Sequence, residues 1–308
     1  MTTRDDYIVG YIGGSGRSGS TILDMMLGAN SRAISTGQLD DLRSWIENGR
    51  YCTCGHALSE CSFWSGVLNS DSDSIPPAIN LSGKAQKFSR TLRVLASGST
   101  RSEAREVDSA WALLDRLAEH SGKHVVLDSS KAALRLARLA RNPKGERLRV
   151  VHLVRDARGY VTSKSFSTLV ESPQGTFGHT AAQSKWAAIM DWIAQNMLML
   201  MVGVVSFRGR YVVITYEQMM RHPEQTLTRV ADLLEIKYES SMLPPLDRAD
   251  FHLIGGNSSR LAFTELRYDD KWRHKLTSRE RFLIQLASGW LYWLLARVAA
   301  RHERAAAA

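Results

Sequence analysis

The residues best suited by type and spacing to do chemistry stand near the amino terminus, in YIVGYIGGSGRSGSTILDMMLGA, residues 7–29. A strand-like apolar run at 7–12 leads into a loop rich in glycine and serine, and a helix-like run follows. In such a loop, successive backbone N–H groups and a helix N-terminus can hold anionic oxygens. A loop for nucleoside triphosphates would carry lysine where this chain has Ser20, and the only cation, Arg17, stands three residues earlier. The loop therefore predicts a phosphate-bearing ligand that does not need the triphosphate lysine.

A second pair of anion-binding residues follows another strand-like run, at 149–154, which leads directly into RDARGYVTSKS. With a helix beginning near Ala157, Arg155 lies at the strand tip and Ser163 about two turns into the helix. A guanidinium fork matches phosphate oxygens, and a hydroxyl at this distance can close on the same group. The pair therefore predicts a second phosphate site.

Together these two motifs resemble the sulfotransferases that use 3′-phosphoadenosine 5′-phosphosulfate (PAPS), in the bacterial and Golgi-type branches whose first loop reads G-R-S-G-[ST]-T. The resemblance rests on GGSGRSGSTIL and VVHLVRDARGYVTSKS. It extends to VVLDSSKAALRLARLA, CTCGHALSECSFW, HLIGGNSSR and DDKWRHKLT, and so spans nearly the whole chain. It implies PAPS as the donor, no required metal, and these ligand-binding residues: Gly16, Arg17, Ser18, Gly19, Ser20 and Thr21 at the 5′-phosphosulfate, Arg155 and Ser163 at the 3′-phosphate, and Gly256, Asn257 and Arg260 in a late G-N-x-x-R element.

The implied reaction is in-line transfer of a sulfuryl group from PAPS to an acceptor hydroxyl or amine, with release of 3′-phosphoadenosine 5′-phosphate. Negative charge grows on the bridging oxygen as its bond to sulfur breaks, so a cation there stabilises the transition state. Arg17 is our candidate for that cation, and Lys131, in DSSK after the strand-like run 124–127, is a second. Alternatively, Lys131 begins a basic stripe with Arg135 and Arg138 at helical spacing that faces solvent.

The general base is harder to assign, because an acceptor hydroxyl must lose its proton to a positioned group. Many relatives have G-E soon after the first helix, where the glutamate is the expected base. This chain has STGQLDDLRSW, with Gln38 in that place, and glutamine cannot accept the proton. Either Gln38 marks an inactive or altered site, or another residue serves; the candidates are Asp40, Asp41, Asp128 at a strand tip, and the imidazoles of His56, His179 and His252.

The chain's three cysteines are close together in CTCGHALSECSFW, as Cys52, Cys54 and Cys61, with His56 among them. Three thiols and an imidazole could fill a tetrahedral zinc shell. The C-x-C start, however, lacks the two-residue spacing of the usual zinc knuckles. We therefore expect a compact loop in which the cysteines pack as small apolar residues.

The wider chain predicts an α/β fold with a P-loop-like parallel sheet flanked by helices. Strand-like runs alternate with longer helical patterns, and they occupy residues 7–12, 124–127, 149–154 and 211–215. With 308 residues, of which 44% are hydrophobic and 23% charged, the chain can form one domain over residues 1–308. Within it, we expect residues 40–120 to form a substrate-side cap over the carboxyl edge of the sheet, where open parallel sheets bind ligands.

Charge leaves two competing functions open. The chain has 40 basic and 31 acidic residues and a net charge of +9, and nine of the basic residues lie between 131 and 160. A P-loop kinase or NTPase could use Asp128, in HVVLD, to hold magnesium. A non-enzymatic polyanion-binding protein would use the basic segment, although no nucleic-acid module is apparent, and we expect no nucleic-acid partner.

The acceptor is compatible with a small metabolite, a glycan, a lipid or a peptide hydroxyl, and the oligomeric state is open. Six aromatic residues are candidates for an apolar acceptor pocket: Trp45, Phe63, Trp64, Phe166, Phe177 and Trp186. The N-terminal residues lack the pattern of a signal peptide. The apolar regions 187–207 and 282–300 contain polar residues, so we expect core helices, no transmembrane segment and a cytoplasmic protein.

Overall fold

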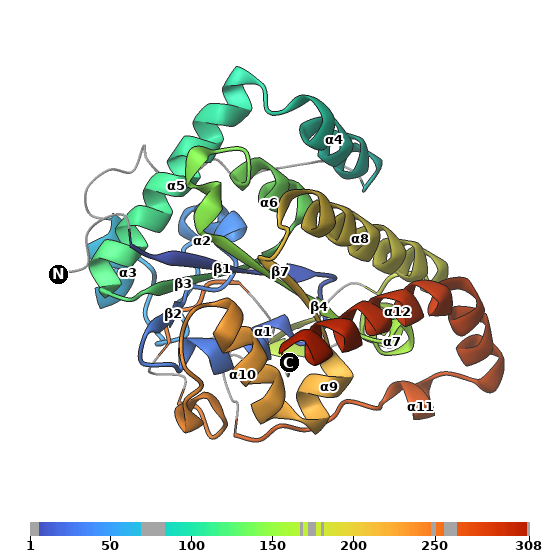
Figure 1. The fold of residues 1–308 in the computed structure, drawn as a ribbon. Helices are drawn as coiled ribbons and strands as arrows, with labels where there is room; N and C mark the ends of the chain where they lie inside the picture. Colours follow the sequence, from blue (N-terminus) through green and yellow to red (C-terminus); the bar gives the residue numbers. More distant parts are fainter. Residues whose placement is uncertain are drawn as a thin grey trace.

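The structure, a computed structural model, describes residues 6–68, 84–166, 169–171, 177–179, 182–247, 251–255 and 264–306. It contains a five-stranded sheet in the order β2-β3-β1-β4-β7, in which every pair of neighbours is parallel (Figure 1). The strands are β1 (Ile8–Gly14), β2 (Ala33–Ser35), β3 (Val125–Lys131), β4 (Leu148–Val154) and β7 (Tyr211–Thr215). The predicted fold class and the four predicted strands are confirmed. The sequence analysis missed β2, a three-residue strand at the edge of the sheet. Two further short strands, β5 (Leu169–Glu171) and β6 (Phe177–His179), form a separate antiparallel pair.

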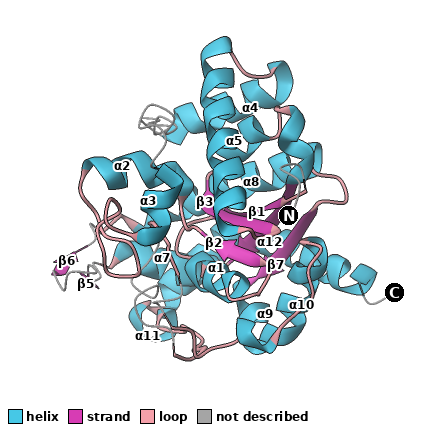
Figure 2. Ribbon diagram, turned by 90° about the vertical axis from the view of Figure 1, so that its left-hand side faces the viewer, coloured by secondary structure: helices cyan, strands magenta, loops and turns pink. Residues whose placement is uncertain are grey.

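Both faces of the sheet are buried, and the alternation of side chains along β1 shows how. Val9 and Tyr11 pack into one hydrophobic cluster, whereas Ile8 and Ile12 pack into another. In Figures 1 and 2 helices lie on the two sides of the sheet. The first cluster is covered by α5 (Arg101–Ser121), α6 (Ala133–Leu139) and α8 (Lys185–Ser206), and the second by α1 (Ser20–Gly28) and α10 (Pro223–Leu233).

The remaining helices complete the layers. A third cluster joins α7 (Ala157–Ser165) to α8 and to the C-terminal helix α12 (Ser278–Ala306). The bounds are α2 (Leu42–Glu47), α3 (Ser62–Leu68), α4 (Lys84–Ser97), α7 (Ala157–Ser165), α9 (Tyr216–Arg221), α11 (Trp272–Lys275) and α12 (Ser278–Ala306), with 3-10 helices η1 (Leu39–Asp41), η3 (Pro143–Arg147) and η4 (Ser240–Met242).

The segment 40–120, expected as a cap, contributes in two ways. Its helices α2, α3 and α5 pack in the first hydrophobic cluster, on a face of the sheet. Thr91 of α4 instead lines a cavity near the carboxyl edge. The division into one domain with a substrate-side cap stays a prediction.

The strand order positions the candidate site. The chain crosses from β3, on one side of β1, to β4 on the other. The connections that follow these three strands therefore meet at the carboxyl edge around β1, which is where ligands of open parallel sheets bind. Both predicted anion-binding motifs stand at this edge.

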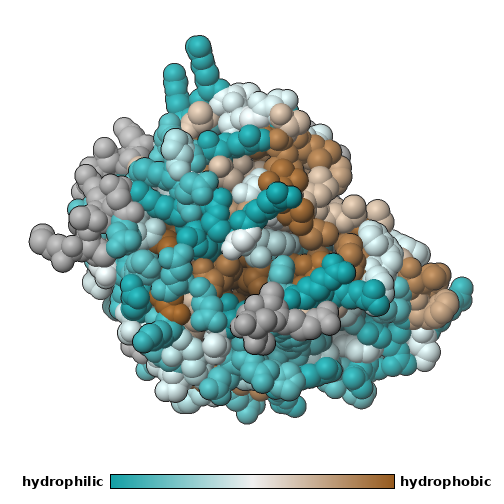
Figure 3. Space-filling view, in the orientation of Figure 1, coloured by the Kyte–Doolittle hydropathy of each residue, from teal (hydrophilic) through white to brown (hydrophobic). Residues whose placement is uncertain are grey.

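Two helices, α8 and α12, are long and apolar enough to cross a membrane by length and composition alone. Half of the apolar window of α8 is buried inside the protein, compared with 28% for α12. Hydrophobic residues also gather on the exposed face of α8 in the view of Figure 3. The cytoplasmic location stays a prediction.

The basic segment 131–160 does not form an open cationic surface. The alternative in which Arg135 and Arg138 belong to a solvent-facing stripe is wrong, because these residues are 4% and 3% exposed. Arg135 pairs with Asp128, and Arg138 pairs with Glu103. Five more basic residues of the segment have acidic partners: Lys144, Arg147, Arg149, Arg155 and Arg158. Their charge is largely neutralised within the fold.

Candidate functional site

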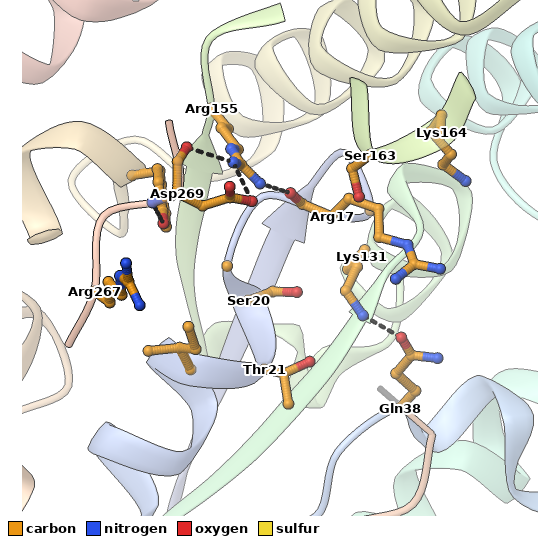
Figure 4. Close-up of a pocket in the computed structure, with 14 residues that line it drawn as sticks. Arg17, Ser20, Thr21, Gln38, Lys131, Arg155, Ser163, Lys164, Arg267 and Asp269 are labelled. Carbon is orange, nitrogen blue, oxygen red and sulfur yellow. Dashed lines mark hydrogen bonds and ion pairs between the residues drawn. The ribbon is translucent and has the colours of Figure 1, made fainter. Parts of the chain in front are cut away.

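A cavity of about 380 Å³ opens at the carboxyl edge of the sheet (Figure 4). It brings together residues from the ends of β1, β3 and β4 and from the chain that precedes α11. Its lining residues are Gly16, Arg17, Gly19, Ser20, Thr21, Ile22, Gln38, Lys131, Arg155, Ser163, Lys164, Tyr216, Arg267 and Asp269. Five of these are cations and one is a carboxylate, so the cavity is suited to an anionic ligand.

The loop after β1 has the conformation expected of an anion cradle. Helix α1 begins at Ser20, and Gly19 before it has a φ of 91°, a conformation that favours glycine. A Cβ on Gly19 would also lie 2.8 Å from the ring of Tyr216. No side chain caps the helix at Gly19, so the N–H groups of the first turn can point to a ligand at the end of the helix.

Two residues of this loop differ in where their side chains go. Arg17 lines the cavity and has a left-handed backbone, with a φ of 63°. Ser18 is buried, and its hydroxyl donates a hydrogen bond to the carbonyl oxygen of Ser15 at 2.8 Å. The side chain of Ser18 therefore holds the loop, and the binding of the 5′-phosphosulfate by Ser18 stays a prediction.

Arg155 stands at the tip of β4, as predicted. Its Nη1 donates to the carbonyl oxygen of Arg17 at 3.1 Å, and its Nη2 donates to the carboxylate of Asp269 at 3.0 Å. The guanidinium also stacks 4.6 Å from the ring centre of Tyr216. Gly159 makes room for it, because a Cβ there would meet Nε at 2.7 Å. Ion pairing with Arg155 outweighs burial and lowers the pKa of Asp269.

Lys131 is the last residue of β3, and its side chain points to Gln38 in the wall of the cavity (Figure 4). Its Nζ donates to Oε1 of Gln38 and, at 3.0 Å, to the carbonyl oxygen of Ser129. The Nε2 of Gln38 donates in turn to Asp41 at 2.8 Å. Burial lowers the pKa of Lys131 although carboxylates, including that of Asp40, oppose the shift. Lys131 therefore lines the cavity, and a chain of hydrogen bonds links it through Gln38 to Asp41.

A second cavity, of about 420 Å³, adjoins the first. The two share Gly16, Lys131 and Lys164 in their linings. Its polar wall includes Asp40 and Asp191, and its apolar wall is formed by Ala132, Ala133, Leu134, Ala194 and Leu198. Lys131 therefore stands where the two cavities meet.

Asp40 is the acid of the second cavity that stands beside Lys131. Its Oδ1 is buried and has no hydrogen-bond partner among the described residues. Burial, with a further contribution from Asp41, raises the pKa of Asp40 to about 6. A carboxyl group with this pKa is ionised at neutral pH but still basic enough to accept a proton.

The comparisons with known proteins concern the middle of the chain most directly. Residues 145–240 match the sulfotransferase family. The matched segment contains β4 and α7, and so includes Arg155 and Ser163. No curated protein matches the sequence significantly.

Several solved sulfotransferase structures are similar over most of the chain. The sulfotransferase domain of the Synechococcus PCC 7002 olefin synthase is 20% identical over 95% of this chain and 97% of that one, with a TM-score of 0.49. The sulfotransferase domain from the curacin biosynthetic pathway is 17% identical over 94% and 99%, also with a TM-score of 0.49. A sulfotransferase from Alicyclobacillus acidocaldarius is 14% identical over 92% and 95%, with a TM-score of 0.41. TM-scores below 0.5 describe a loose likeness, so the candidate site is interpreted from its own geometry.

Some predicted residues lie away from the cavities, and others lie outside the described residues. Asp128 is fully buried, and its oxygens accept hydrogen bonds from Ser130 and Arg135. This geometry disfavours Asp128 as a base or magnesium ligand. Gly256, Asn257 and Arg260 lie outside the described residues, as do the side chains of Phe177 and His179. The other five candidate aromatics line neither cavity: Trp45, Phe63, Trp64, Phe166 and Trp186.

The three cysteines do lie together, but the imidazole beside them is that of His252. His56, which the sequence analysis grouped with them, is exposed. We expected the cysteines to pack as small apolar residues. The structure differs from this expectation, because the polar imidazole of His252 lies among the three sulfurs.

Sequence reasoning missed several residues of the candidate site. Asp269 and Arg267 line the cavity, but neither follows a strand. Both are far in sequence from the two loop motifs, so no local pattern indicates that they lie beside them. Gln195, on α8, accepts a hydrogen bond from the N–H of Gly16 at 3.4 Å. Asp24, one turn into α1, is buried beside Ser129 and near Lys131, and burial raises its pKa to about 7. A polar residue within the apolar run TILDMML was the one sequence signal for Asp24.

Proposed function

We propose that the protein is a sulfotransferase that moves a sulfuryl group from PAPS to an acceptor hydroxyl. The observation that carries this proposal is the meeting of Arg17, Lys131 and Arg155, from three strand ends, in one cavity at the N-terminus of α1. The family match over residues 145–240 supports the same activity. The chemistry needs a cradle for one phosphosulfate and a separate cation for the 3′-phosphate.

The residues of the cavity favour a bisphosphate over a triphosphate. Ser20 stands where the lysine of a triphosphate loop would be, and its hydroxyl lies in the cavity wall. Arg155 lies beyond the loop, where a phosphate that reaches it would compete with Asp269 for the guanidinium. Arg267 and Lys164 add charge around the same space. These features support binding of the 5′-phosphosulfate at the loop and of the 3′-phosphate at Arg155 and Ser163.

When bound, PAPS supplies a sulfuryl group whose bond to the 5′-phosphate oxygen breaks as the acceptor oxygen bonds to sulfur. Arg17 and Lys131 would stabilise the charge that develops on the leaving oxygen, which is greatest in the transition state. The N–H groups of the first turn of α1 would hold the 5′-phosphate in line. No proton is needed by the leaving phosphate, whereas the acceptor hydroxyl must lose one.

Asp40 is our proposed general base. It lies beside Lys131 in the second cavity, and its buried Oδ1 lacks a hydrogen-bond partner among the described residues. Asp41 is less suited, because Gln38 occupies its Oδ2. In this proposal Gln38 is a neutral support for Lys131, and the base function belongs to a residue two positions later in the chain.

The second cavity is the proposed acceptor site. It opens onto Lys131 at one end and combines an apolar wall on α6 and α8 with the carboxylates of Asp40 and Asp191. This lining suits an uncharged or cationic acceptor with an apolar body and a hydroxyl group, such as a small metabolite or lipid.

Calorimetric titration tests the donor. The protein is titrated with 3′-phosphoadenosine 5′-phosphate, with adenosine 5′-phosphate and with ATP, each with and without magnesium. Tight, metal-independent binding of the bisphosphate with weak binding of ATP is expected. Magnesium-dependent preference for ATP would instead support a kinase or NTPase, and salt-sensitive binding of nucleic acid without bisphosphate preference would support a polyanion-binding protein.

A further inference from the structure

Four side chains with metal-binding atoms meet at a place apart from the two cavities described above, because none of the four lines either cavity. Cys52, Cys54 and Cys61 belong to one loop, and His252 belongs to a segment about 200 residues later in the chain. One atom from each, three Sγ and one ring nitrogen, lies within 4.8 Å of every other. All three cysteines are free thiols.

Three of the six distances between these atoms are close to the edges of a small tetrahedron, and the other three are at most 4.8 Å. Nδ1 of His252 lies 3.3 Å from Sγ of Cys61 and 3.8 Å from Sγ of Cys52, and the sulfurs of Cys54 and Cys61 are 3.6 Å apart. With zinc bonds of about 2.3 Å to sulfur and about 2.0 Å to nitrogen, a tetrahedral site has sulfur–sulfur edges of ~3.8 Å and sulfur–nitrogen edges of ~3.5 Å. The cluster therefore has room for one ion at its centre.

The histidine is fixed in place by the cysteine loop itself. Trp64 Nε1 donates to the carbonyl oxygen of His252 at 2.8 Å, and the ring of Phe63 stacks on the imidazole with centres 4.9 Å apart. The hydroxyl of Thr53 donates to the carbonyl oxygen of Phe251 at 2.6 Å and accepts from the N–H of Leu253 at 3.0 Å. The imidazole is thus aimed at the sulfurs by contacts on both sides of it.

Two of the three sulfurs of the cluster lie inside the protein. The hydroxyl of Thr53 lies 3.9 Å from the sulfur of Cys52. Cys52 and Cys61 are buried at 0% and 1% exposure, so the centre of the cluster is shielded from water.

We propose that Cys52, Cys54, Cys61 and His252 bind one zinc ion as a closed structural site. Three thiolates and an imidazole are the donors that zinc prefers, and four protein ligands leave no open position for a substrate. The three thiols lose their protons to solvent on binding, and His252 coordinates through Nδ1. The C-x-C spacing is tolerated because the fourth ligand comes from a distant segment and completes the geometry.

The ion would hold the segment 251–255 against the transfer site. Ile254 accepts a hydrogen bond from the N–H of Gln38 at 2.9 Å, and its own N–H donates to Thr36 at 3.1 Å. A Cβ on Gly255 would lie 2.8 Å from Gln38. His252 is therefore two residues from Ile254, which contacts Gln38, the hydrogen-bond partner of Lys131. In this proposal the ion positions the segment that contacts Gln38 and takes no part in the transfer reaction.

Metal content tests this proposal without any measurement of transfer. The full chain is purified without chelators or an affinity tag that binds metals, and zinc per chain is measured by plasma mass spectrometry. One zinc per chain is expected. After replacement by cobalt, the intense visible absorption of tetrahedral Co(II) and a thiolate-to-cobalt charge-transfer band are expected.

Variants identify the ligands. Cys54→Ser and His252→Ala should weaken zinc binding roughly tenfold or more in competition with a chromophoric chelator. His252→Cys should retain one metal per chain with a shifted cobalt spectrum. His56→Ala is the matched control, since it removes an exposed imidazole from the same loop, and should bind zinc as the unaltered protein does.

Three results would overturn the proposal. The first is that the wild-type protein takes up no stoichiometric zinc or cobalt in the presence of a reductant. The second is a disulfide between Cys54 and Cys61 instead of a bound metal. The third is unchanged zinc affinity in both Cys54→Ser and His252→Ala. If a variant fails to fold, the cobalt spectrum of the wild-type protein still decides the outcome. Bisphosphate binding is measured separately, so a failure of the donor proposal does not affect this test.

Discussion

Arg155 donates a hydrogen bond to the backbone carbonyl oxygen of Arg17 at 3.1 Å, although the two residues are 138 positions apart in the chain. The bond joins the tip of β4 to the loop after β1. The two predicted anion-binding motifs are thereby parts of one site, and the other arm of the same guanidinium binds Asp269. A ligand phosphate at Arg155 must share or replace that carboxylate.

Arg155→Ala should separate the two phosphate positions. Loss of a charge-assisted hydrogen bond costs about 1.5–3 kcal/mol, so binding of 3′-phosphoadenosine 5′-phosphate should weaken roughly tenfold to a hundredfold more than binding of adenosine 5′-phosphate. Calorimetry on both nucleotides measures the difference. Arg149→Ala is the matched control, because Arg149 stands at the opposite end of β4 and pairs with Glu235. Equal loss for both nucleotides would mean that Arg155 acts only through the Arg17 loop.

Asp269→Asn should tighten bisphosphate binding. The carboxylate neutralises Arg155 and would repel a 3′-phosphate, whereas an amide keeps the hydrogen-bonding shape without the charge. We expect an affinity gain of about tenfold at low ionic strength that shrinks as salt is added. Weaker binding in the variant would show that Asp269 is needed to orient Arg155.

The pH dependence of transfer should identify the base. The pKa of Asp40 is raised to about 6 by burial, so kcat/KM should fall as pH decreases through that value and the base becomes protonated. Asp40→Asn should reduce transfer roughly a hundredfold or more and remove this acid limb.

Two further variants control the assignment of Asp40. Asp41→Asn should retain the acid limb, because Asp41 is engaged by Gln38. Gln38→Glu should not restore an Asp40→Asn enzyme, since the new carboxylate would pair with Lys131. Recovery of activity in that double variant would assign the base to position 38 instead.

The buried Asp24 should make the fold less stable as pH rises. Burial raises its pKa from 3.8 to about 7, so the folded state holds a proton that the unfolded state releases, and stability declines by about 1.4 kcal/mol per pH unit between these values. Denaturant unfolding at pH 5 and pH 7 should show a smaller decline for Asp24→Asn than for the unaltered protein, by roughly 2 kcal/mol. An equal decline in both would mean that other groups control the pH dependence.

Much of the fold was predictable from local patterns. The strands β1, β3, β4 and β7 contain short apolar runs that are followed by glycine, aspartate, arginine or threonine, and parallel strands buried on both faces require such runs. The edge strand β2 has three residues, too few for a pattern. Likewise, Arg17 and Arg155 were identified because each follows a strand within a recognisable loop motif.

The sequence by itself determined the type of chemistry. Strand ends followed by glycine, hydroxyl and arginine residues specify an anion site, because the backbone geometry and the charge that bind the anion come from residues within about ten positions of one another. Only the tertiary structure decided which distant groups complete the site. Asp269 reaches Arg155, Gln195 reaches Gly16, and His252 joins the cysteines through contacts that span more than 100 residues. It also decided that Asp128 and Arg135 neutralise one another in the interior. Such pairings depend on how layers pack across the sheet, and no local spacing encodes them.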